Sequence, residues 1–326
     1  MIKIKDIYEY DIVIIGGGIS GCEASYISAV NGAKTLLITI NTDSIGHMSF
    51  ENYISNTDGI NAAGNKIWQR MALPTAAGKL CFESKIVKSL KNNKIKDFII
   101  IDRKRLMMAL KAILERQKNI TIRQSLVIDI VPESNIFNTL TNDGTTYKSK
   151  AVILAPGTFL DSNIFWGNYN IAAGRPGEIA SKKLLNNLIK IGFKFKKAKL
   201  YAGPKIDGRT LDLNKYYRNK KKFKLNIIPE GKETKEMYID GFNNSNGEEE
   251  QLKTMRRIQG LENVIMTRPG YGINYNILSP SQINKNLESK KFPGLFFCGR
   301  INGRIKYEDT AAEGYLAGTN ASKKVK

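Results

Sequence analysis

The chain has 326 residues and a formal net charge of +21, with 51 lysine and arginine residues against 30 aspartate and glutamate residues. This length allows one large domain or two medium ones with an ample core. A positive charge of this size favours a nucleic-acid partner, although a genome bias toward lysine would also produce it. No apolar run approaches the roughly 20 residues of a membrane span, and residues 1–5 do not begin a signal peptide. We therefore expect a cytoplasmic protein with no membrane partner.

The cysteine and histidine content points away from metal and disulfide chemistry. Cys22, Cys81 and Cys298 show neither paired nor metal-ligand spacing, so they fit a reducing compartment and no metal site is predicted. The single histidine, His47, has no obvious partner. We interpret it as a solvated loop residue rather than a catalytic one.

Near the N-terminus, an apolar strand runs into a glycine-rich turn. Residues 12–15 are Ile-Val-Ile-Ile, which is typical of a buried parallel strand. Gly16, Gly18 and Gly21 have the spacing at which the first glycine turns the chain, the second admits a pyrophosphate and the third packs a helix on the strand. Together with Gly17, they predict a dinucleotide site at a helix N-terminus. The alternative is a purely structural turn.

The elements after this turn bear on which dinucleotide is bound. We predict a helix over 22–31 that ends at Gly32, and a second strand over 34–39. An NAD site usually has an acidic residue where the second strand ends. Residues 38–41 read Ile-Thr-Ile-Asn, and the nearest acid, Asp43, falls in the following loop. This pattern argues against ordinary NAD and leaves FAD open.

A second glycine-tipped strand near the C-terminus favours FAD. Residues 293–303 form an apolar run that ends in glycines, and 307–320 predict a helix with Glu308 and Asp309 in its first turn. Two-segment FAD domains return to the flavin in this way. A third buried strand, within 151–158, also ends in a turn, where such folds cross over to a second domain.

The remaining elements are predicted from periodicity and turn signals. Before the crossover they are short helices at 66–71 and 84–90, a strand at 98–101, a helix at 103–117 capped by Asp102, strands at 120–123, 126–131 and 135–140, and a hairpin turn at 142–144. After it they are a turn at 174–177, a helix at 179–191, a strand at 194–197, an irregular loop at 203–210, strands at 226–229 and 236–239, a helix at 248–259 and a strand at 264–267.

These elements predict an α/β fold with two domains. Residues 1–158 and 265–326 would form a discontinuous, Rossmann-like FAD-binding domain of the glutathione-reductase type, and 159–264 an inserted α+β domain. Two basic clusters with interleaved aromatic residues, 194–199 and 218–224, lie in the inserted domain. They favour an RNA-facing surface there.

Segments typical of one protein family occur in family order along most of the chain. They are residues 11–23, 45–49, 157–161, 204–210, 229–231, 255–262, 268–271 and 294–321. The Arg-Pro-Gly-Tyr of 268–271 and the Ile-Asn-Gly of 301–303 are the most specific. On these segments the chain resembles the glucose-inhibited division protein A family (GidA, also MnmG), which are FAD-dependent enzymes that modify the wobble uridine of tRNA.

The resemblance implies a function and a set of site residues. Reduced FAD would take a one-carbon unit from methylenetetrahydrofolate and pass it to C5 of a uridine, with NADH as a further substrate. The implied partners are RNA, most of all tRNA, and a second copy of the chain or a full-length relative. The implied FAD contacts are Gly16, Gly17, Gly18, Gly21, Val127, Gly157, Gly299, Ile301, Asn302 and Glu308. The implied folate or phosphate contacts are Lys205, Arg209 and Arg268.

The sequence also departs from the family. The family carries a helical C-terminal domain for tRNA and a GTPase partner, so we expect a short form that lacks it. A family cysteine follows Met-Ser where this chain has Phe50, and the region of the second, 211–228, contains none. Since a thiolate can attack the uracil ring, no catalytic residue is assigned, and Cys298 is interpreted as a buried thiol. The alternatives are a non-catalytic FAD-binding accessory or RNA-binding protein, and an NAD(P)H-dependent flavin oxidoreductase.

Overall fold

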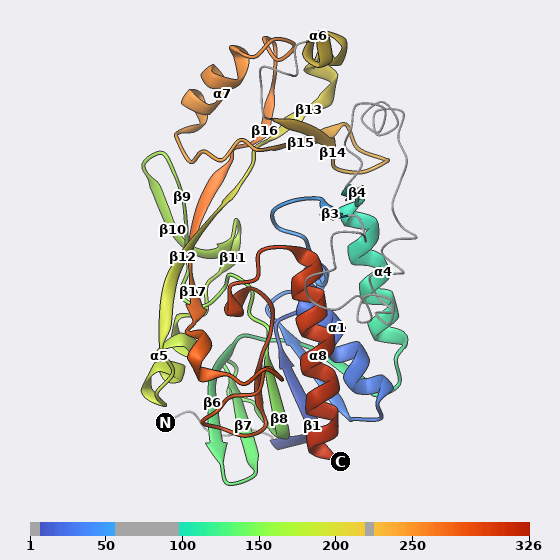
Figure 1. Ribbon diagram of the computed structural model, residues 1–326, viewed down its shortest axis with the longest axis vertical. Helices are drawn as coiled ribbons and strands as arrows, with labels where there is room; N and C mark the ends of the chain where they lie inside the picture. The colour runs from blue at the N-terminus through green and yellow to red at the C-terminus, as the bar shows by residue number, and fades with distance from the viewer. Residues whose placement is uncertain (1–6, 56–97, 219–224) are drawn as a thin grey trace.

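The computed structural model describes residues 7–55, 98–218 and 225–326, and three sheets organise them (Figure 1). A seven-stranded sheet lies in the lower half of the view, with α8 across its front. A five-stranded sheet stands along the left side, and a four-stranded sheet with two helices lies at the top. The predicted short helices at 66–71 and 84–90 lie outside the described residues.

The seven-stranded sheet joins a parallel half to an antiparallel half. In the order β5-β2-β1-β8, all neighbours are parallel, and β18 adds to β8 in the same direction. The hairpin of β6 and β7 continues the sheet in the antiparallel sense. Its strands are β1 (Ile7–Ile15), β2 (Thr35–Thr39), β5 (Ile120–Gln124), β6 (Val127–Glu133), β7 (Ile136–Thr141), β8 (Thr146–Leu154) and β18 (Leu295–Phe297).

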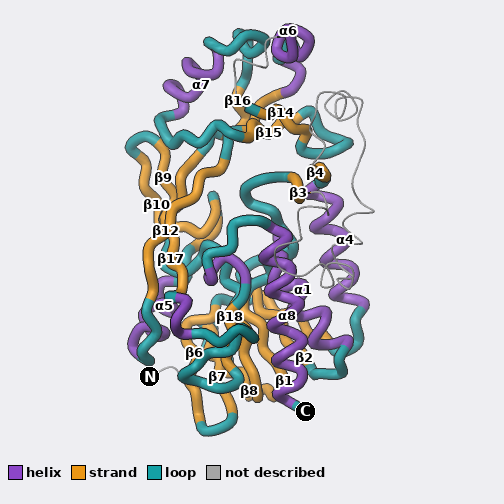
Figure 2. The backbone as a smooth tube through the Cα atoms, viewed as in Figure 1, coloured by secondary structure: helices purple, strands orange, loops and turns teal. Residues whose placement is uncertain are grey.

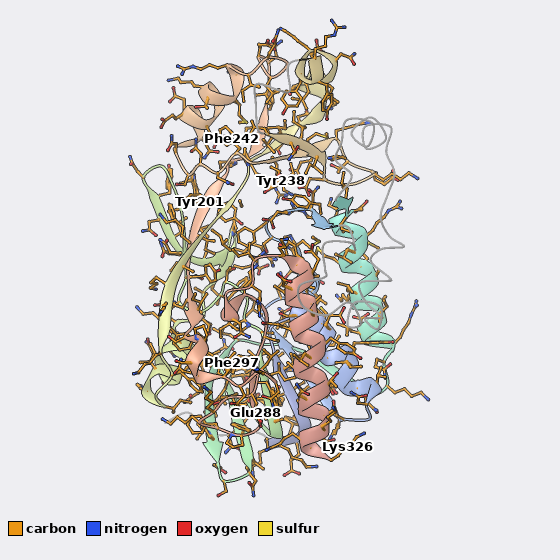
Figure 3. The ribbon with its side chains drawn as sticks, viewed as in Figure 1. Tyr201, Tyr238, Phe242, Glu288, Phe297 and Lys326 are labelled. Atoms are coloured by element: carbon orange, nitrogen blue, oxygen red, sulfur yellow. The ribbon has the colours of Figure 1, made fainter. Side chains whose placement is uncertain are left out.

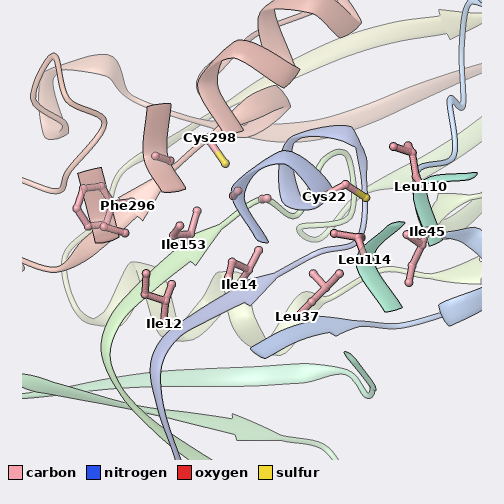
Figure 4. Close-up of a cluster of buried hydrophobic side chains, with 14 of the residues drawn as sticks. Ile12, Ile14, Cys22, Leu37, Ile45, Leu110, Leu114, Ile153, Phe296 and Cys298 are labelled. Atoms are coloured by element: carbon pink, nitrogen blue, oxygen red, sulfur yellow. The ribbon is translucent and has the colours of Figure 1, made fainter. Parts of the chain in front are cut away.

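Both faces of this sheet are covered by apolar groups, as the continuous apolar strands predict. Ile12 and Ile14 point into one cluster, which takes in Cys22 of α1 and Leu110 of α4 (Figure 4). Val13 and its face of the sheet pack into a second cluster under α5. The helices involved are α1 (Ile19–Val30), α4 (Arg103–Arg116), α5 (Lys182–Lys190) and α8 (Tyr307–Val325).

The two helices that follow the glycine-tipped strands pack against each other along their length (Figure 2). A Cβ on Gly314 of α8 would lie 2.2 Å from the carbonyl oxygen of Ser20, and one on Gly318 would lie 2.4 Å from Ile27. The small residues of α8 therefore serve its contact with α1. This contact holds the first and last segments of the chain together.

The five-stranded sheet has the order β11-β10-β9-β17-β12 and is antiparallel throughout. Its strands are β9 (Asn163–Trp166), β10 (Tyr169–Arg175), β11 (Glu178–Ile179), β12 (Phe195–Ala202) and β17 (Tyr271–Leu278). Strand β17 belongs to the predicted FAD-binding domain, which resumes at residue 265. It nevertheless pairs with β9 and β12 of the predicted inserted domain. The predicted domain boundaries themselves stay a prediction.

Smaller elements complete the described part of the chain. The four-stranded sheet, in the order β14-β15-β13-β16, packs under α6 and α7, and β3 pairs with β4 near the cavity described below. Their bounds are β3 (Tyr53–Ser55), β4 (Phe98–Ile100), β13 (Lys205–Asp207), α6 (Leu213–Arg218), β14 (Asn226–Pro229), β15 (Glu236–Asp240), α7 (Glu248–Arg256) and β16 (Met266–Arg268). None of the described helices combines the length and the apolar character that crossing a membrane requires.

Several element predictions need correction. The helix predicted at 179–191 begins only at Lys182, because Ile179 is part of β11. The predicted loop at 203–210 contains β13, whose fully buried Ile206 is held between β15 and β16. The strand predicted at 194–197 continues to Ala202 because β17 pairs along its whole length. Pairing partners distant in sequence decide these cases, and local patterns do not record them.

Candidate functional site

A cavity lies at the carboxyl ends of β1, β2 and β8, where open α/β sheets bind their ligands. It contains about 970 Å³ of empty space, part of it open to solvent. Gly16, Gly17 and Gly18 line one wall, and Arg300 and Tyr307 from the end of the chain line another. Two segments that are remote in sequence thus share one cavity.

The three glycines of the turn play distinct structural parts. Gly16 has a φ of +110°, and a Cβ there would lie 2.2 Å from the carbonyl oxygen of Ala155. A Cβ on Gly21 would lie 1.8 Å from the carbonyl oxygen of Gly16, so α1 packs directly on the turn. Gly18 has nothing within 4 Å of the place of its missing Cβ and lines the cavity. Because no side chain caps α1 at Gly18, its first N–H groups are available to an anion.

Five of the predicted FAD contacts line this cavity, and the other five are not part of its wall. Those that line it are Gly16, Gly17, Gly18, Val127 and Gly157. Of the others, Gly299 donates its N–H to Glu313 Oε2 over 2.9 Å, and Ile301 is fully buried in the core. Gly21, Asn302 and Glu308 are also absent from the wall. The residues of the last segment that do reach the cavity are Arg300, Tyr307 and Thr310.

His47 is part of the cavity wall and is not a solvated loop residue. Desolvation, and then the positive charges of Arg175, Arg103 and Lys205, lower the pKa of its imidazole to about 2. Its Nδ1 lies 3.4 Å from Ser49 Oγ. The imidazole is therefore neutral at physiological pH and can exchange hydrogen bonds with a ligand without adding charge.

An ion pair from the five-stranded sheet joins this loop. Arg175 binds the carboxylate of Glu178 through Nη2 and donates to Ser49 Oγ over 3.4 Å through Nη1. Both charged side chains line the cavity. The pair connects β10 and β11 to the loop that carries His47.

A second ion pair, between Arg103 and Glu230, also fixes the loop that carries His47. Arg103, at the start of α4, donates to the carbonyl oxygens of Met48 and Phe50 over 2.7 and 2.6 Å. Its Nη2 lies 3.2 Å from Glu230 Oε1, and both side chains are only 6% exposed. Asp102 caps the same helix through the N–H of Arg105, as the sequence predicts. The loop between Met48 and Phe50 is thus fixed by a buried guanidinium.

Arg300 is one of the cavity residues that sequence reasoning missed. Its guanidinium carbon lies 4.4 Å from the ring centre of Phe50 and 5.1 Å from that of Tyr307. The residue is 7% exposed, and neither Nη1 nor Nη2 has a hydrogen-bond partner among the described residues. The only sequence signal for Arg300 is that an arginine follows directly where the apolar run of residues 295–298 reaches Gly299.

The predicted folate or phosphate contacts lie outside the cavity wall. Lys205 and Arg268 are paired residues of β13 and β16, so the fold brings them together. Lys205 Nζ lies 3.2 Å from carboxylate oxygens of both Glu230 and Glu236. Burial alone would raise the pKa of Glu236, but Lys205, Thr267 and Arg268 hold it below its usual value. Arg209 is exposed and pairs with Asp207.

Comparison with known proteins decides the family. The family profile described as Glucose inhibited division protein A matches residues 11–227 and 217–326. The chain belongs to the GidA family. The enzyme of Karelsulcia muelleri named tRNA uridine 5-carboxymethylaminomethyl modification enzyme MnmG is 31% identical over 394 positions, covering 97% of this chain and 64% of that enzyme. The Aquifex aeolicus enzyme of the same name is 29% identical, with 96% and 64% covered.

Solved GidA structures share the fold. GidA of Aquifex aeolicus superposes with a TM-score of 0.83 at 30% identity, over 97% of this chain and 63% of that one. Glycine oxidase of Geobacillus kaustophilus, at 12% identity and a TM-score of 0.58, covers 98% of this chain and 95% of its own, and shares the fold alone. The predicted α/β fold with a parallel sheet is confirmed.

This chain spans less than two thirds of the length of the GidA relatives that it matches. The alignment to the Karelsulcia muelleri enzyme also runs over 394 positions, 68 more than the 326 residues of this chain. Relative to that enzyme, this chain therefore lacks residues inside the matched region as well.

The described cysteines give this GidA-family chain no accessible thiol. Cys22 and Cys298 are buried and unpaired, and burial raises the pKa of both thiols well above its usual value. The interpretation of Cys298 as a buried thiol is confirmed. Cys81 lies outside the described residues.

Proposed function

We propose that this chain binds FAD and takes part in C5 modification of uridine in tRNA, the activity that its relatives' name states. The observation that carries the proposal is the cavity that Gly18 and Tyr307 share from opposite ends of the chain. Where the cavity passes the end of β2, it is lined by Ile38, Thr39 and Ile40, without the carboxylate that an NAD ribose usually meets.

The cavity residues fit the parts of FAD. Gly18 and the first N–H groups of α1 would hold the diphosphate. Val127, which also lines the cavity, would lie beside the adenine. When bound, the flavin would supply the transfer of electrons and of a one-carbon unit. The protein would orient it, and Phe50 and Tyr307 would exclude water.

Lys205, Arg209 and Arg268 would serve anionic substrates beside this cavity. Lys205 and Arg268 both contact the carboxylate of Glu236. The side chain of Arg268 is still 68% exposed, so it would be accessible to an incoming anion. Methylenetetrahydrofolate fits this requirement because its glutamate carboxylates are anionic. NADH would act as the reductant. A second chain or a longer relative would be the protein partner.

One face of the five-stranded sheet supports the RNA part of the proposal. Lys197, Lys199 and Tyr201 alternate along β12 and so share that face. Tyr201 pairs with Gly272, which pairs with Phe165 on β9, and the two rings lie 6.5 Å apart at 76°. Lys199 Nζ lies 4.9 Å from the ring centre of Phe165. Figure 3 places Tyr201 in the upper left of the view, on the side where the five-stranded sheet lies.

This arrangement suits single-stranded RNA. Bases stack on aromatic rings, and lysines attract the phosphates between them. Asn274 and Asn163 form the row next to Phe165 and supply amide groups for base edges. The face comprises part of the predicted basic cluster at 194–199, whereas most of the cluster at 218–224 lies outside the described residues.

Two experiments test the RNA part. Fluorescence anisotropy with labelled tRNA over a series of salt concentrations should show binding that weakens steeply as salt rises, and Lys199→Ala should reduce the salt slope by about 1. Lys253→Ala, an exposed lysine of α7 that pairs with Glu249, is the matched control. Equal slopes for all three proteins would remove this face from the proposal.

The activity is tested in a strain that lacks the gene. Mass spectrometry of its tRNA nucleosides should show loss of a C5-modified uridine, restored by the intact gene. An unchanged nucleoside profile would overturn the modification proposal. Because the described cysteines are buried, the non-catalytic FAD-binding alternative has a specific observation in its favour. Anaerobic bleaching of the bound flavin by NADH would argue against it.

A further inference from the structure

Arg300 carries a charge that nothing in the described part of the chain balances. The other cationic side chains beside the cavity have carboxylate partners. These pairs are Arg175 with Glu178, Arg103 with Glu230, Lys205 with Glu230 and Glu236, and Arg304 with Glu313. Arg300 makes no such pair with a described residue, and both of its terminal nitrogens lack hydrogen-bond partners there.

An unpaired buried guanidinium is expensive. Removing it from water is strongly unfavourable unless hydrogen bonds and an opposite charge replace the water. The rings of Phe50 and Tyr307 offset part of this cost through cation–π contact. The two rings do not accept hydrogen bonds from the N–H groups of Arg300, which point outward in the plane of the guanidinium. The side chain is therefore poised for a planar acceptor that enters the cavity.

The neighbouring carboxylate is not that acceptor. Glu313 Oε2 receives the N–H of Gly299 and the amide of Asn302, each over 2.9 Å. Its Oε1 receives Arg304 Nε over 2.6 Å. These donors occupy three of the about four acceptor positions of the carboxylate, and its ion pair is with Arg304. Among the described residues no group bonds the terminal nitrogens of Arg300, which leaves its guanidinium open to the negative charge of a ligand.

The location of Arg300 indicates which ligand. A Cβ on the preceding Gly299 would lie 2.5 Å from Ser20 Oγ, so the arginine leaves the chain beside the first turn of α1. Residues 11–25, which form the turn and that helix start, contain no basic residue. The helix dipole is the one positive contribution that this segment offers to a diphosphate. Arg300 adds a full charge to the same cavity.

We propose that Arg300 binds the negative charge of the dinucleotide in this cavity through Nη1 and Nη2. The inference rests on the proposed binding of FAD. The charge has two possible sources in FAD, namely the diphosphate and the flavin ring once it is reduced. Arginine matches the paired oxygens of the first, and a fixed positive charge favours the anionic form of the second.

The test compares Arg300→Met with the wild type in two measurements. If the diphosphate is the partner, the variant binds both FAD and ADP-ribose, which has the diphosphate without the flavin, at least about tenfold more weakly. If the reduced ring is the partner, ADP-ribose binding is unchanged and the midpoint potential of the bound flavin falls. Either result supports the proposal. Equal affinities and equal potentials overturn it.

Controls separate this inference from the proposed function. Lys253→Met, on the exposed side of α7, should leave both measurements unchanged. If Arg300→Met does not fold by circular dichroism, Arg300→Gln removes the charge and keeps a polar side chain. A wild-type protein that binds no FAD overturns the proposed function and this inference with it. A wild type that binds FAD, but with the same affinity and the same midpoint potential as Arg300→Met, overturns this inference alone.

Discussion

The backbone N–H of Phe50 donates a hydrogen bond to the phenol oxygen of Tyr307 over 3.0 Å, and 257 positions of sequence separate the two residues. Phe50 lies in the loop between β2 and β3, and Tyr307 begins α8. Both line the cavity. This hydrogen bond therefore fastens the two remote segments that the proposed FAD site requires.

Removing this hydrogen bond should loosen the cavity. Tyr307→Phe leaves the N–H of Phe50 buried without its acceptor, which costs about 1–3 kcal/mol of unfolding free energy. We expect a lower urea midpoint and weaker FAD binding by fluorescence titration. Tyr169→Phe removes a hydroxyl from an exposed tyrosine and is the control. Identical midpoints for the two variants would contradict the role of the hydrogen bond.

Substitutions at two glycines of the turn should have different effects, one on FAD binding and the other on stability. Gly18→Ala places a methyl group in the open cavity, so FAD affinity should fall while stability changes by less than about 0.5 kcal/mol. Gly21→Ala forces a methyl group to 1.8 Å from the Gly16 carbonyl oxygen and should cost about 3 kcal/mol or more. Thermal melts and FAD titrations measure the two effects. A Gly18→Ala protein with unchanged FAD affinity would count against a phosphate position at Gly18.

How far the sequence predicts this site depends on the kind of signal. The G-x-G-x-x-G spacing and the apolar run before it locate Gly16, Gly18 and Gly21, because the strand, turn and helix start follow one another directly in the sequence. Arg300 could not be found in that way. Its isolation depends on Glu313 pairing with Arg304, and the sequence does not show which of the two arginines that carboxylate takes. Likewise Lys205 and Arg268 meet only through the register of β13 and β16.

Loss of the buried Arg103–Glu230 pair should lower the stability of the protein far more than loss of the nearby contacts of Arg105. Arg103→Met removes the partner of Glu230 and two hydrogen bonds to the loop of Met48 and Phe50, so it should cost about 3–5 kcal/mol. Arg105→Met, two residues along α4, removes a half-exposed guanidinium that contacts Glu233 and the edge of Asp102, and should cost less than about 1 kcal/mol. Urea denaturation compares them. Similar losses would mean that the buried pair does not hold the loop.

His47 should make the fold sensitive to acid. The imidazole takes up a proton near pH 6.5 when unfolded but only near pH 2 when folded. Between these values the unfolded state binds the extra proton, so stability falls as pH drops below 6.5. From pH 7.5 to 5.5, His47→Gln should lose about 1.4 kcal/mol less stability than the wild type.

Because the chain has a single histidine, NMR can follow this group directly. The ring resonance of the folded protein should not titrate between pH 8 and pH 5. A titration centred near 6.5 in the folded state would show that the imidazole is solvated and would contradict its place in the cavity wall.

The most direct test of the central claim is a calorimetric titration of the folded, flavin-free protein with FAD. The account predicts saturation at one FAD per chain, with affinity reduced in both Gly18→Ala and Tyr307→Phe, because the first and last segments of the chain form a single site. A folded protein that shows no saturable uptake of FAD, or that binds it equally well with both variants, would contradict it.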